Sequence, residues 1–163
     1  LTADRWKLPT VQQMKEEAQT DMPPVVERDA ELFWEKNAVD GRISLTDYDG
    51  RTVVIGREQF FSHTTAKGRD NRIALWNAML DTLQHPDEVW LNNEIKSDEL
   101  NTYCLLKFYR DEVMTVNYRI EGEELVLKTW YVMQTNLKGK TIAYMKKKIW
   151  DVRRRGLLVI KKR

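Results

Sequence analysis

Three consecutive β-forming runs lie between residues 103 and 133, in the stretch YCLLKFYRDEVMTVNYRIEGEELVLKTWYVM. Apolar and polar side chains alternate along it, which is the pattern of strands with one buried face. The runs cover residues 103–109, 113–120 and 125–133. The Glu121-Gly122 pair between the last two suits a tight turn. This stretch therefore predicts an antiparallel meander.

Shorter strands are predicted on both sides of the meander. Ile43–Tyr48 and Thr52–Ile55 flank Asp49-Gly50, a dipeptide typical of two-residue hairpin turns. Glu88–Leu91 and Leu157–Ile160 are the remaining β-forming runs. Together with the meander, these runs supply a mostly antiparallel sheet.

Helical periodicity appears upstream and downstream of the strands. Helices are predicted over residues 10–20, 24–38, 71–84 and 142–152, with a helical turn over 57–65. The last helix has an apolar face and a basic face. The apolar face consists of Ile142, Met145, Ile149 and Val152, and the basic face of Lys146, Lys147, Lys148, Arg153 and Arg154. Because helices precede a mostly antiparallel sheet, the predicted class is α+β.

The composition excludes several classes of protein. A chain of 163 residues with 42% apolar residues is long enough for one domain with a core. Cys104 is the only cysteine, so no internal disulfide exists, and one Cys with two His cannot form a Cys/His zinc cluster. No signal peptide and no apolar run of about 18 residues is present. Since the chain begins at Leu1 rather than Met, we expect a piece of a longer protein that does not itself enter a membrane.

The charge is near balance in total, with 27 Lys and Arg against 25 Asp and Glu, but it is unevenly distributed. Residues 1–40 hold five basic and nine acidic residues, a net charge of −4. Residues 138–163 hold eleven basic residues and one acidic residue, a net charge of +10, which leaves −4 for the middle. A basic end of this kind attracts polyanions, although a solvated surface explains it equally well. We expect residues 1–41 to form an acidic helical arm and residues 42–163 the main domain.

His63 is the first candidate for catalysis. It lies in a polar stretch with Lys67, Gly68 and Arg69, and Arg72 follows on the next predicted helix. Histidine transfers protons near neutral pH, and the guanidinium fork of arginine binds phosphate oxygens. A surface loop histidine beside a helix start is the alternative. The second histidine, His85, precedes a proline at a helix exit and is interpreted as structural.

Thr129 and Tyr131 are two residues apart in one predicted strand, so their hydroxyls lie on the same face. Regular alternation places Leu125, Leu127 and Met133 on that face as well, and Lys128 and Trp130 on the other. The pattern does not decide which face is the core. The two hydroxyls would suit a scissile phosphate, while a threonine in a strand is also an ordinary β-former.

The sequence has no Gly-rich phosphate loop, Walker motif, nucleophile-elbow motif or His-x-x-x-His pair. If the candidate residues lie close together, they are sufficient for metal-independent cleavage of RNA. In this reaction the 2′-hydroxyl attacks the adjacent phosphodiester of its own chain. His63 would act as base or acid, Arg69 and Arg72 as a phosphate clamp, and Thr129 as a hydrogen-bond donor. No cofactor is expected.

Several segments resemble the phage-associated branch of the BECR nucleases, the group of barnase, EndoU, the tRNase colicins and RelE-like toxins. The resemblance covers about residues 57–160, and its most distinctive motif is Pro86-Asp87-Glu88-Val89-Trp90. It also includes Lys128-Thr129-Trp130-Tyr131 and Arg155-Gly156-Leu157-Leu158. It implies N-terminal helices packed on one face of the sheet and the active site on the other, with His63, Arg72, Thr129 and Tyr131 as catalytic residues.

The resemblance further implies a toxin-type endoribonuclease that cleaves tRNA or another RNA. Members occur in phage head-morphogenesis proteins and in contact-dependent bacterial toxins, often with a cognate immunity protein. We therefore expect a domain that acts in the cytoplasm of a target bacterium, from a parent that is secreted, cell-surface or phage-associated. The expected RNA-binding residues are Lys67, Arg69, Lys146, Lys147, Lys148, Arg153 and Arg154.

Two other functions stay open from the sequence. The first is a non-catalytic nucleic-acid-binding or phage structural module, in which the basic end binds a backbone. The second is an ADP-ribosyltransferase toxin, which requires a nicotinamide-cofactor pocket and a catalytic glutamate. Glu123 and Glu124, beside the predicted hairpin turn, give it little support.

Overall fold

The computed structural model describes residues 8–64 and 71–161 and contains one seven-stranded sheet in this part of the chain. Its strands lie in the order β1-β2-β6-β5-β4-β3-β7. They are β1 (Arg42–Thr46), β2 (Thr52–Gly56), β3 (Glu88–Leu91), β4 (Thr102–Phe108), β5 (Val113–Glu121), β6 (Glu124–Met133) and β7 (Leu157–Lys161). All neighbours pair antiparallel except β2 and β6. The predicted α+β class, the hairpin around Asp49-Gly50 and the meander are confirmed.

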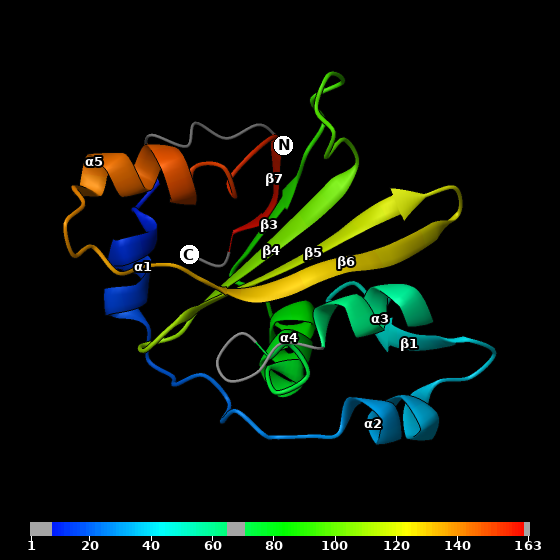
Figure 1. Ribbon diagram of the computed structural model, residues 1–163. Helices are drawn as coiled ribbons and strands as arrows, with labels where there is room; N and C mark the ends of the chain where they lie inside the picture. Colours follow the sequence, from blue (N-terminus) through cyan, green and yellow to red (C-terminus); the bar gives the residue numbers. More distant parts are fainter. Residues whose placement is uncertain (1–7, 65–70, 162–163) are drawn as a thin grey trace.

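Helices cover both faces of the sheet (Figure 1). They are α1 (Val11–Glu17), α2 (Ala30–Asn37), α3 (Arg57–His63), α4 (Trp76–Gln84) and α5 (Ile142–Met145), which continues into a π-helical turn, η3 (Lys146–Trp150). The larger core lies under α2, α3 and α4, where Trp34, Phe60 and Trp76 pack on the sheet. On the opposite face, Val11 of α1 and Met145 of α5 pack with Trp90 and Trp150. The helices are therefore divided between the faces, with α1 apart from α2–α4.

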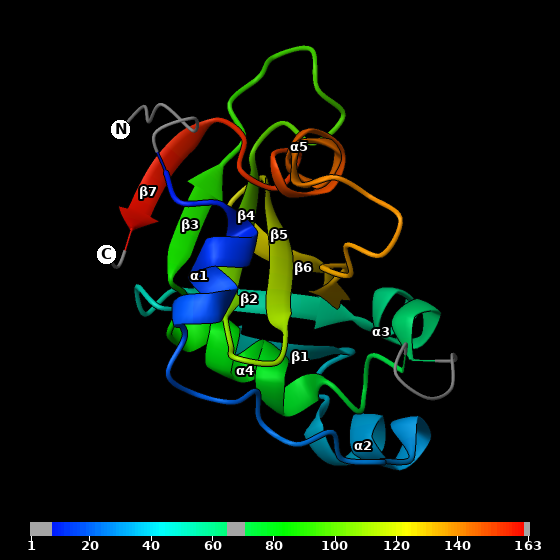
Figure 2. The ribbon, with the colours of Figure 1, turned by 90° about the vertical axis from the view of Figure 1, so that its left-hand side faces the viewer.

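The sheet is strongly twisted, so that the β1–β2 hairpin runs across the direction of β3, β4 and β5 (Figure 2). β2 pairs with β6 only at Val53↔Leu125 and Val54↔Val126. Beyond Val126, no described strand pairs with this edge of β6. Side chains from α3 and from the turn before α4 contact the edge instead.

A β-bulge at Lys128 changes the direction of the side chains in β6. Asn117 of β5 lies opposite Thr129, whereas the next residue, Tyr118, lies opposite Leu127, so Lys128 has no partner across the strands. Leu127 and Trp130 consequently both enter the core under α2–α4, while Met133 joins the core on the other face. The expectation of regular alternation, with Leu125, Leu127 and Met133 on one face, is wrong for this reason.

Helix α4 begins at Trp76, five residues later than predicted. Residues 71–76 form tight i→i+3 turns, with Ala74 N donating to Asn71 O at 3.1 Å and Leu75 N donating to Arg72 O at 3.2 Å. A capping box between Thr10 and Gln13 begins α1.

The C-terminal helix is shorter and wound differently than predicted. Because η3 is π-helical, side chains five residues apart share a side, and Met145 and Trp150 are buried together. Ile142 and Val152, which were expected on the apolar face, are 53% and 37% exposed. The wider π-helical turn therefore buries a different set of side chains from the set that α-helical spacing predicts.

Arg154 does not lie on the exposed basic face, contrary to expectation. Its side chain is buried and forms two hydrogen bonds with Glu88, from Nε to Oε1 at 2.9 Å and from Nη2 to Oε2 at 2.6 Å. It also donates to the carbonyl of Pro9 at 2.6 Å, and Trp90 Nε1 donates to Glu88 at 2.9 Å. Arg154 thus joins β3, the C-terminal segment and the start of the described chain, and it is not available to a phosphate.

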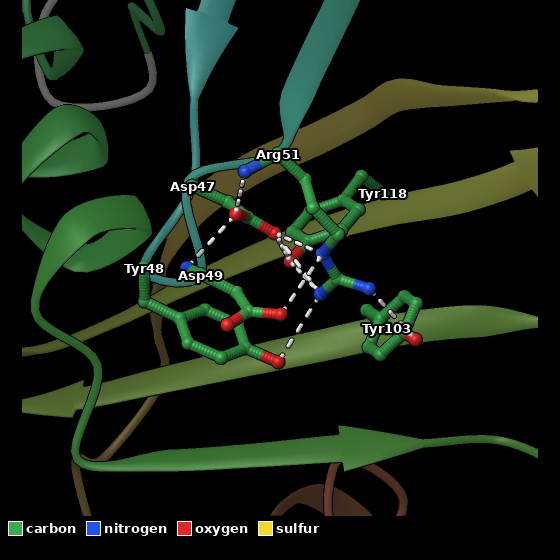
Figure 3. Close-up of polar contacts among 6 residues, drawn as sticks. All are labelled: Asp47, Tyr48, Asp49, Arg51, Tyr103 and Tyr118. Atoms are coloured by element: carbon green, nitrogen blue, oxygen red, sulfur yellow. Dashed lines mark hydrogen bonds and ion pairs between the residues drawn. The ribbon is translucent and has the colours of Figure 1, made fainter.

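A second buried cluster holds the turn of the β1–β2 hairpin against the middle of the sheet (Figure 3). The buried Asp47 carboxylate accepts hydrogen bonds from the backbone N–H groups of Asp49 and Arg51 and from the Tyr118 hydroxyl, the last at 2.8 Å. The guanidinium of Arg51 donates to Asp47 and to the hydroxyl of Tyr103. Burial and the Asp47 charge raise the pKa of Tyr118, so its hydroxyl remains a donor.

The N-terminal segment is bound to the rest of the chain at several points. Val11 and Trp34 are buried in the two cores, and between them the chain crosses α4 as an extended strap, residues 18–29. Val26 N donates to Ala74 O at 3.2 Å, and Arg28 donates to the Asn77 side chain at 3.1 Å. The division at residue 41 stays a prediction.

Gly156 provides a test of the packing between β7 and β3. Its φ is +87°, and a Cβ atom there would lie 2.1 Å from the Leu91 carbonyl oxygen. We expect Gly156→Ala to lower the free energy of unfolding by more than about 3 kcal/mol, because strain and overpacking add. Urea denaturation measures the change. Gly139→Ala is the matched control, since Gly139 also has positive φ but open space around it. Equal losses in the two variants would contradict the steric argument.

Candidate active site

Arg72 is fixed to β6 by reciprocal hydrogen bonds. Its Nη1 donates to Thr129 Oγ1 at 3.0 Å and to the Trp130 carbonyl at 2.8 Å, and Trp130 Nε1 donates back to the Arg72 carbonyl at 2.6 Å. The tight turns before α4 hold the backbone of Arg72 in place, and the bulge places Thr129 opposite the face that Trp130 buries. Arg72 and Thr129, two predicted site residues 57 positions apart, therefore meet.

His63, the last residue of α3, lies at the same part of β6. Its Nε2 is 2.8 Å from the carbonyl oxygen of Lys128, the bulge residue, and the amide of Gln59 shares that carbonyl. The ring also contacts Trp130, with 5.5 Å between ring centroids. The amide nitrogen of Gln59 also lies 2.7 Å from Nε2, so this ring nitrogen has two polar neighbours, whereas no described residue forms a hydrogen bond with Nδ1.

The surroundings of His63 favour its neutral form. Partial burial lowers the pKa of His63, and the nearby charge of Arg72 lowers it further, whereas the hydrogen bond to Lys128 acts in the opposite direction. The net direction is below the ordinary value of 6.5. His63 is therefore unprotonated, and able to accept a proton, at neutral pH.

Tyr131 lies between two guanidinium groups. The Cζ atoms of Arg72 and Arg153 are 5.7 and 5.2 Å from its ring centroid. Burial raises the pKa of Tyr131, so the hydroxyl is a neutral hydrogen-bond donor. Within residues 8–64 and 71–161, no carboxylate forms an ion pair with Arg72 or Arg153. The two cations at Tyr131 thus suit an anionic ligand.

Asn117 and Thr115 extend this cluster across β5. Asn117 pairs with Thr129, and Thr115 pairs with Tyr131, so their side chains lie beside the predicted site residues on the same face of the sheet. From the sequence alone, Asn117 and Thr115 are only polar positions of an alternating strand. Their place beside the candidate site becomes visible once the strand register sets them opposite Thr129 and Tyr131.

The predicted RNA-binding residues that the structure describes lie in different surroundings and do not form one surface. Arg153 belongs to the cluster at Tyr131, and Arg154 is buried with Glu88. Lys147 and Lys148 are exposed on η3, and Lys146 is half-buried. Lys67 and Arg69 lie outside the described residues.

Chemically, this cluster combines a neutral imidazole, two guanidinium groups and two hydroxyls near the bulge of β6. Such a set can bind a phosphodiester and move a proton at it. Among the residues that the structure describes, no three His, Cys, Asp or Glu side chains lie close enough to hold a metal ion. No helix in the same part of the chain has the length and apolar character needed to cross a bilayer.

Comparison with known families agrees with this chemistry. The family model described as phage-Barnase-EndoU-ColicinE5/D-RelE like nuclease 2 matches residues 33–161, which include every element from β1 to β7. No curated protein and no solved structure matches the sequence significantly. Because the match covers most of the 163 residues, the chain belongs to this family of barnase/EndoU/colicin/RelE-type nucleases.

Proposed function

We propose that this nuclease is an endoribonuclease that cleaves RNA without a metal ion, by attack of a 2′-hydroxyl on the adjacent phosphodiester. The observation that carries the proposal is the meeting of His63, Arg72 and Thr129 at residues 128–130 of β6. These groups supply what the reaction requires, namely a proton acceptor, a cation at the phosphate and a hydrogen-bond donor.

Each residue has a role in the proposed reaction. Nδ1 of His63 accepts the proton of the 2′-hydroxyl while the 2′-oxygen attacks phosphorus. Arg72 and Arg153 stabilise the negative charge that develops on the phosphate, and Thr129 donates to a non-bridging oxygen. The hydroxyl of Tyr131 is buried, so Tyr131 acts through its ring, which holds the two guanidinium groups. The bond from phosphorus to the 5′-oxygen breaks, and the His63 imidazolium returns its proton to that oxygen. The products are a 2′,3′-cyclic phosphate and a 5′-hydroxyl.

The biological setting of the proposal follows from the resemblance to tRNase colicins and phage-associated toxins. We include tRNA as the substrate, a cognate immunity protein as the partner, and the cytoplasm of a target bacterium as the place of action. The parent would be a secreted, cell-surface or phage-associated toxin. These parts are independent of the catalytic geometry and can be tested separately.

A non-catalytic nucleic-acid-binding module is the second candidate. It is favoured by one observation: the Nε2 atom of His63 already has a partner in the Lys128 carbonyl, as a structural histidine would. An ADP-ribosyltransferase has no comparable support. Glu123 and Glu124 are exposed at the β5–β6 turn, and Glu124 pairs with Arg42 at 2.6 Å, at the end of β6 away from Lys128–Tyr131.

The first prediction separates catalysis from binding. We expect His63→Ala to lower the rate of RNA cleavage by about 10²–10⁴-fold, because the proton acceptor is lost, while RNA affinity changes little. Cleavage in EDTA is followed by sequencing of RNA ends, and affinity by fluorescence anisotropy. His85→Ala is the control, since His85 is exposed and lies outside the candidate site. Wild-type protein that cleaves neither tRNA nor total RNA would leave the binding module as the function.

The second prediction concerns pH. Because the pKa of His63 is lowered, kcat/KM should rise with pH through a value below 6.5 and be constant at neutral pH. In Arg72→Ala, loss of the neighbouring positive charge should move the titration of His63 to higher pH. NMR titration of the two histidine rings measures this shift even where activity is lost, and His85 serves as the internal reference. A titration of His63 that is the same in Arg72→Ala would contradict the coupling.

The third prediction concerns the exposed lysines of η3. If RNA passes over η3, the variant Lys147→Gln/Lys148→Gln should bind it more weakly and reduce the slope of log K against log salt by about 1.4, or about 0.7 for each lost contact with a single strand. Lys36→Gln on α2 is the control and should leave the slope unchanged. An unchanged slope in the double variant would place these lysines outside the RNA path.

A further inference from the structure

A polar recess lies near Thr129, on the face of the sheet that α1 and α5 partly cover. It is shallow, about 20 Å³, and lies between β3, β4, β5 and the segment that follows η3. Trp90 and Cys104 contribute to its lining together with Asn117, Glu99, Arg153 and Arg155. A recess of this size holds about one water molecule, so at most the edge of a planar group enters it.

Two polar atoms at this recess are buried without a partner. Neither Oδ1 of Asn117 nor Nε of Arg153 forms a hydrogen bond within the described part of the chain, although both atoms are inaccessible to solvent. Buried polar atoms in folded proteins almost always have partners, because an unmade hydrogen bond costs about 1–3 kcal/mol. The lining of the recess therefore contains one acceptor and one donor that no described residue bonds.

The strand register fixes the distance between the recess and the candidate active site. Thr129, Asn117, Cys104 and Trp90 occupy one row across β6, β5, β4 and β3. Neighbouring strands are about 4.8 Å apart, so Asn117 lies one strand away from the hydroxyl that Arg72 contacts. A ribose bridges a comparable distance between a phosphate and its base.

The charges at the recess favour a nucleobase over a second phosphate. Glu99 contributes a carboxylate to the lining, and Arg155 already pairs with Glu94. Burial raises the pKa of Cys104 to about 12, so its side chain is a neutral thiol. An amide such as Asn117 offers both a donor and an acceptor, the combination that matches the edge of a base.

We propose that Asn117 and Arg153 form a base-recognition subsite that reads the nucleobase next to the scissile phosphate. The proposal rests on the proposed ribonuclease function and assigns its sequence preference. Asn117 binds the edge of the base through its amide, and Nε of Arg153 donates to an acceptor on the same edge. The Arg153 guanidinium, which lies over the Tyr131 ring, orients the base relative to the phosphate.

The test uses DNA oligonucleotides that contain a single ribonucleotide, so that only one phosphodiester has a neighbouring 2′-hydroxyl. The base of the ribonucleotide and the base 3′ to it are varied through all combinations, and kcat/KM is measured for each. We expect wild-type protein to prefer particular bases at one of the two positions. In Asn117→Ala, the preference should fall at least tenfold, because cleavage of preferred substrates slows much more than cleavage of poor substrates.

Two further variants keep the result interpretable. Asn93→Ala is the matched control, because Asn93 is exposed and outside the recess, and it should retain the preference. Asn117→Asp keeps the shape of the side chain but removes the amide donor, so it should change which base is preferred. If urea denaturation shows that Asn117→Ala does not fold, Asn117→Asp becomes the variant that decides the test.

The outcomes separate this proposal from the proposed function. Cleavage by wild-type protein together with an unaltered base preference in the Asn117 variants, or an equal loss for all substrates, overturns the subsite and leaves the ribonuclease. If wild-type protein cleaves none of these oligonucleotides, cleavage of tRNA and total RNA decides on the ribonuclease proposal, and anisotropy with the same oligonucleotides tests the subsite. A base-dependent affinity that is lost in Asn117→Ala then supports it, and equal affinities in the two proteins overturn it.

Discussion

The bulge at Lys128 is the feature on which both the packing and the candidate active site depend. One extra residue in β6 turns Trp130 into the core under α2–α4 and leaves Thr129 and Tyr131 on the opposite face. The same irregularity presents the Lys128 carbonyl to His63 rather than to a neighbouring strand. Bulges are common next to active sites because they redirect side chains without ending the strand. Here one insertion determines the direction of the hydroxyls and positions the carbonyl that His63 contacts.

Two buried charged clusters hold the ends of the sheet on either side of this bulge. Asp47 and Arg51 attach the β1–β2 turn to Tyr118 in β5, and Glu88 and Arg154 attach the C-terminal segment to β3. The Glu88–Arg154 pair is buried on both sides, so loss of one partner would cost about 3–5 kcal/mol, whereas Arg51 is partly exposed. Both clusters join segments that are far apart in the sequence.

Local patterns in the sequence predicted much of the fold. The hairpin at Asp49-Gly50 and the meander follow from turn residues and alternation over a few positions. The bulge at Lys128 and the π-helical turn η3 have no such local signal, since each is stabilised by contacts with distant residues. The same limit applies to Arg153 and Arg154, which are adjacent and chemically identical. Only the position of Glu88 decides that Arg154 is buried while Arg153 lies at the site.

The candidate site residues were selected by their chemistry and not by their positions in the fold. His63, Arg72 and Thr129 were selected because their side chains suit phosphate chemistry, and the structure brings them together. Asn117 was missed because asparagine at a polar strand position has no special chemical signature. It becomes significant once the register sets it beside Thr129 and its Oδ1 is found buried without a partner.

The hydrogen bond between Arg72 and Thr129 joins residues 57 positions apart, and the contact between His63 and Lys128 joins residues 65 positions apart. Contacts of such long range carry a large entropic cost of loop closure. The candidate cluster therefore exists only when α3, the turn before α4 and β6 are in place together, because each supplies one of its groups. A fragment that lacks β6 retains His63 and Arg72 but none of these contacts.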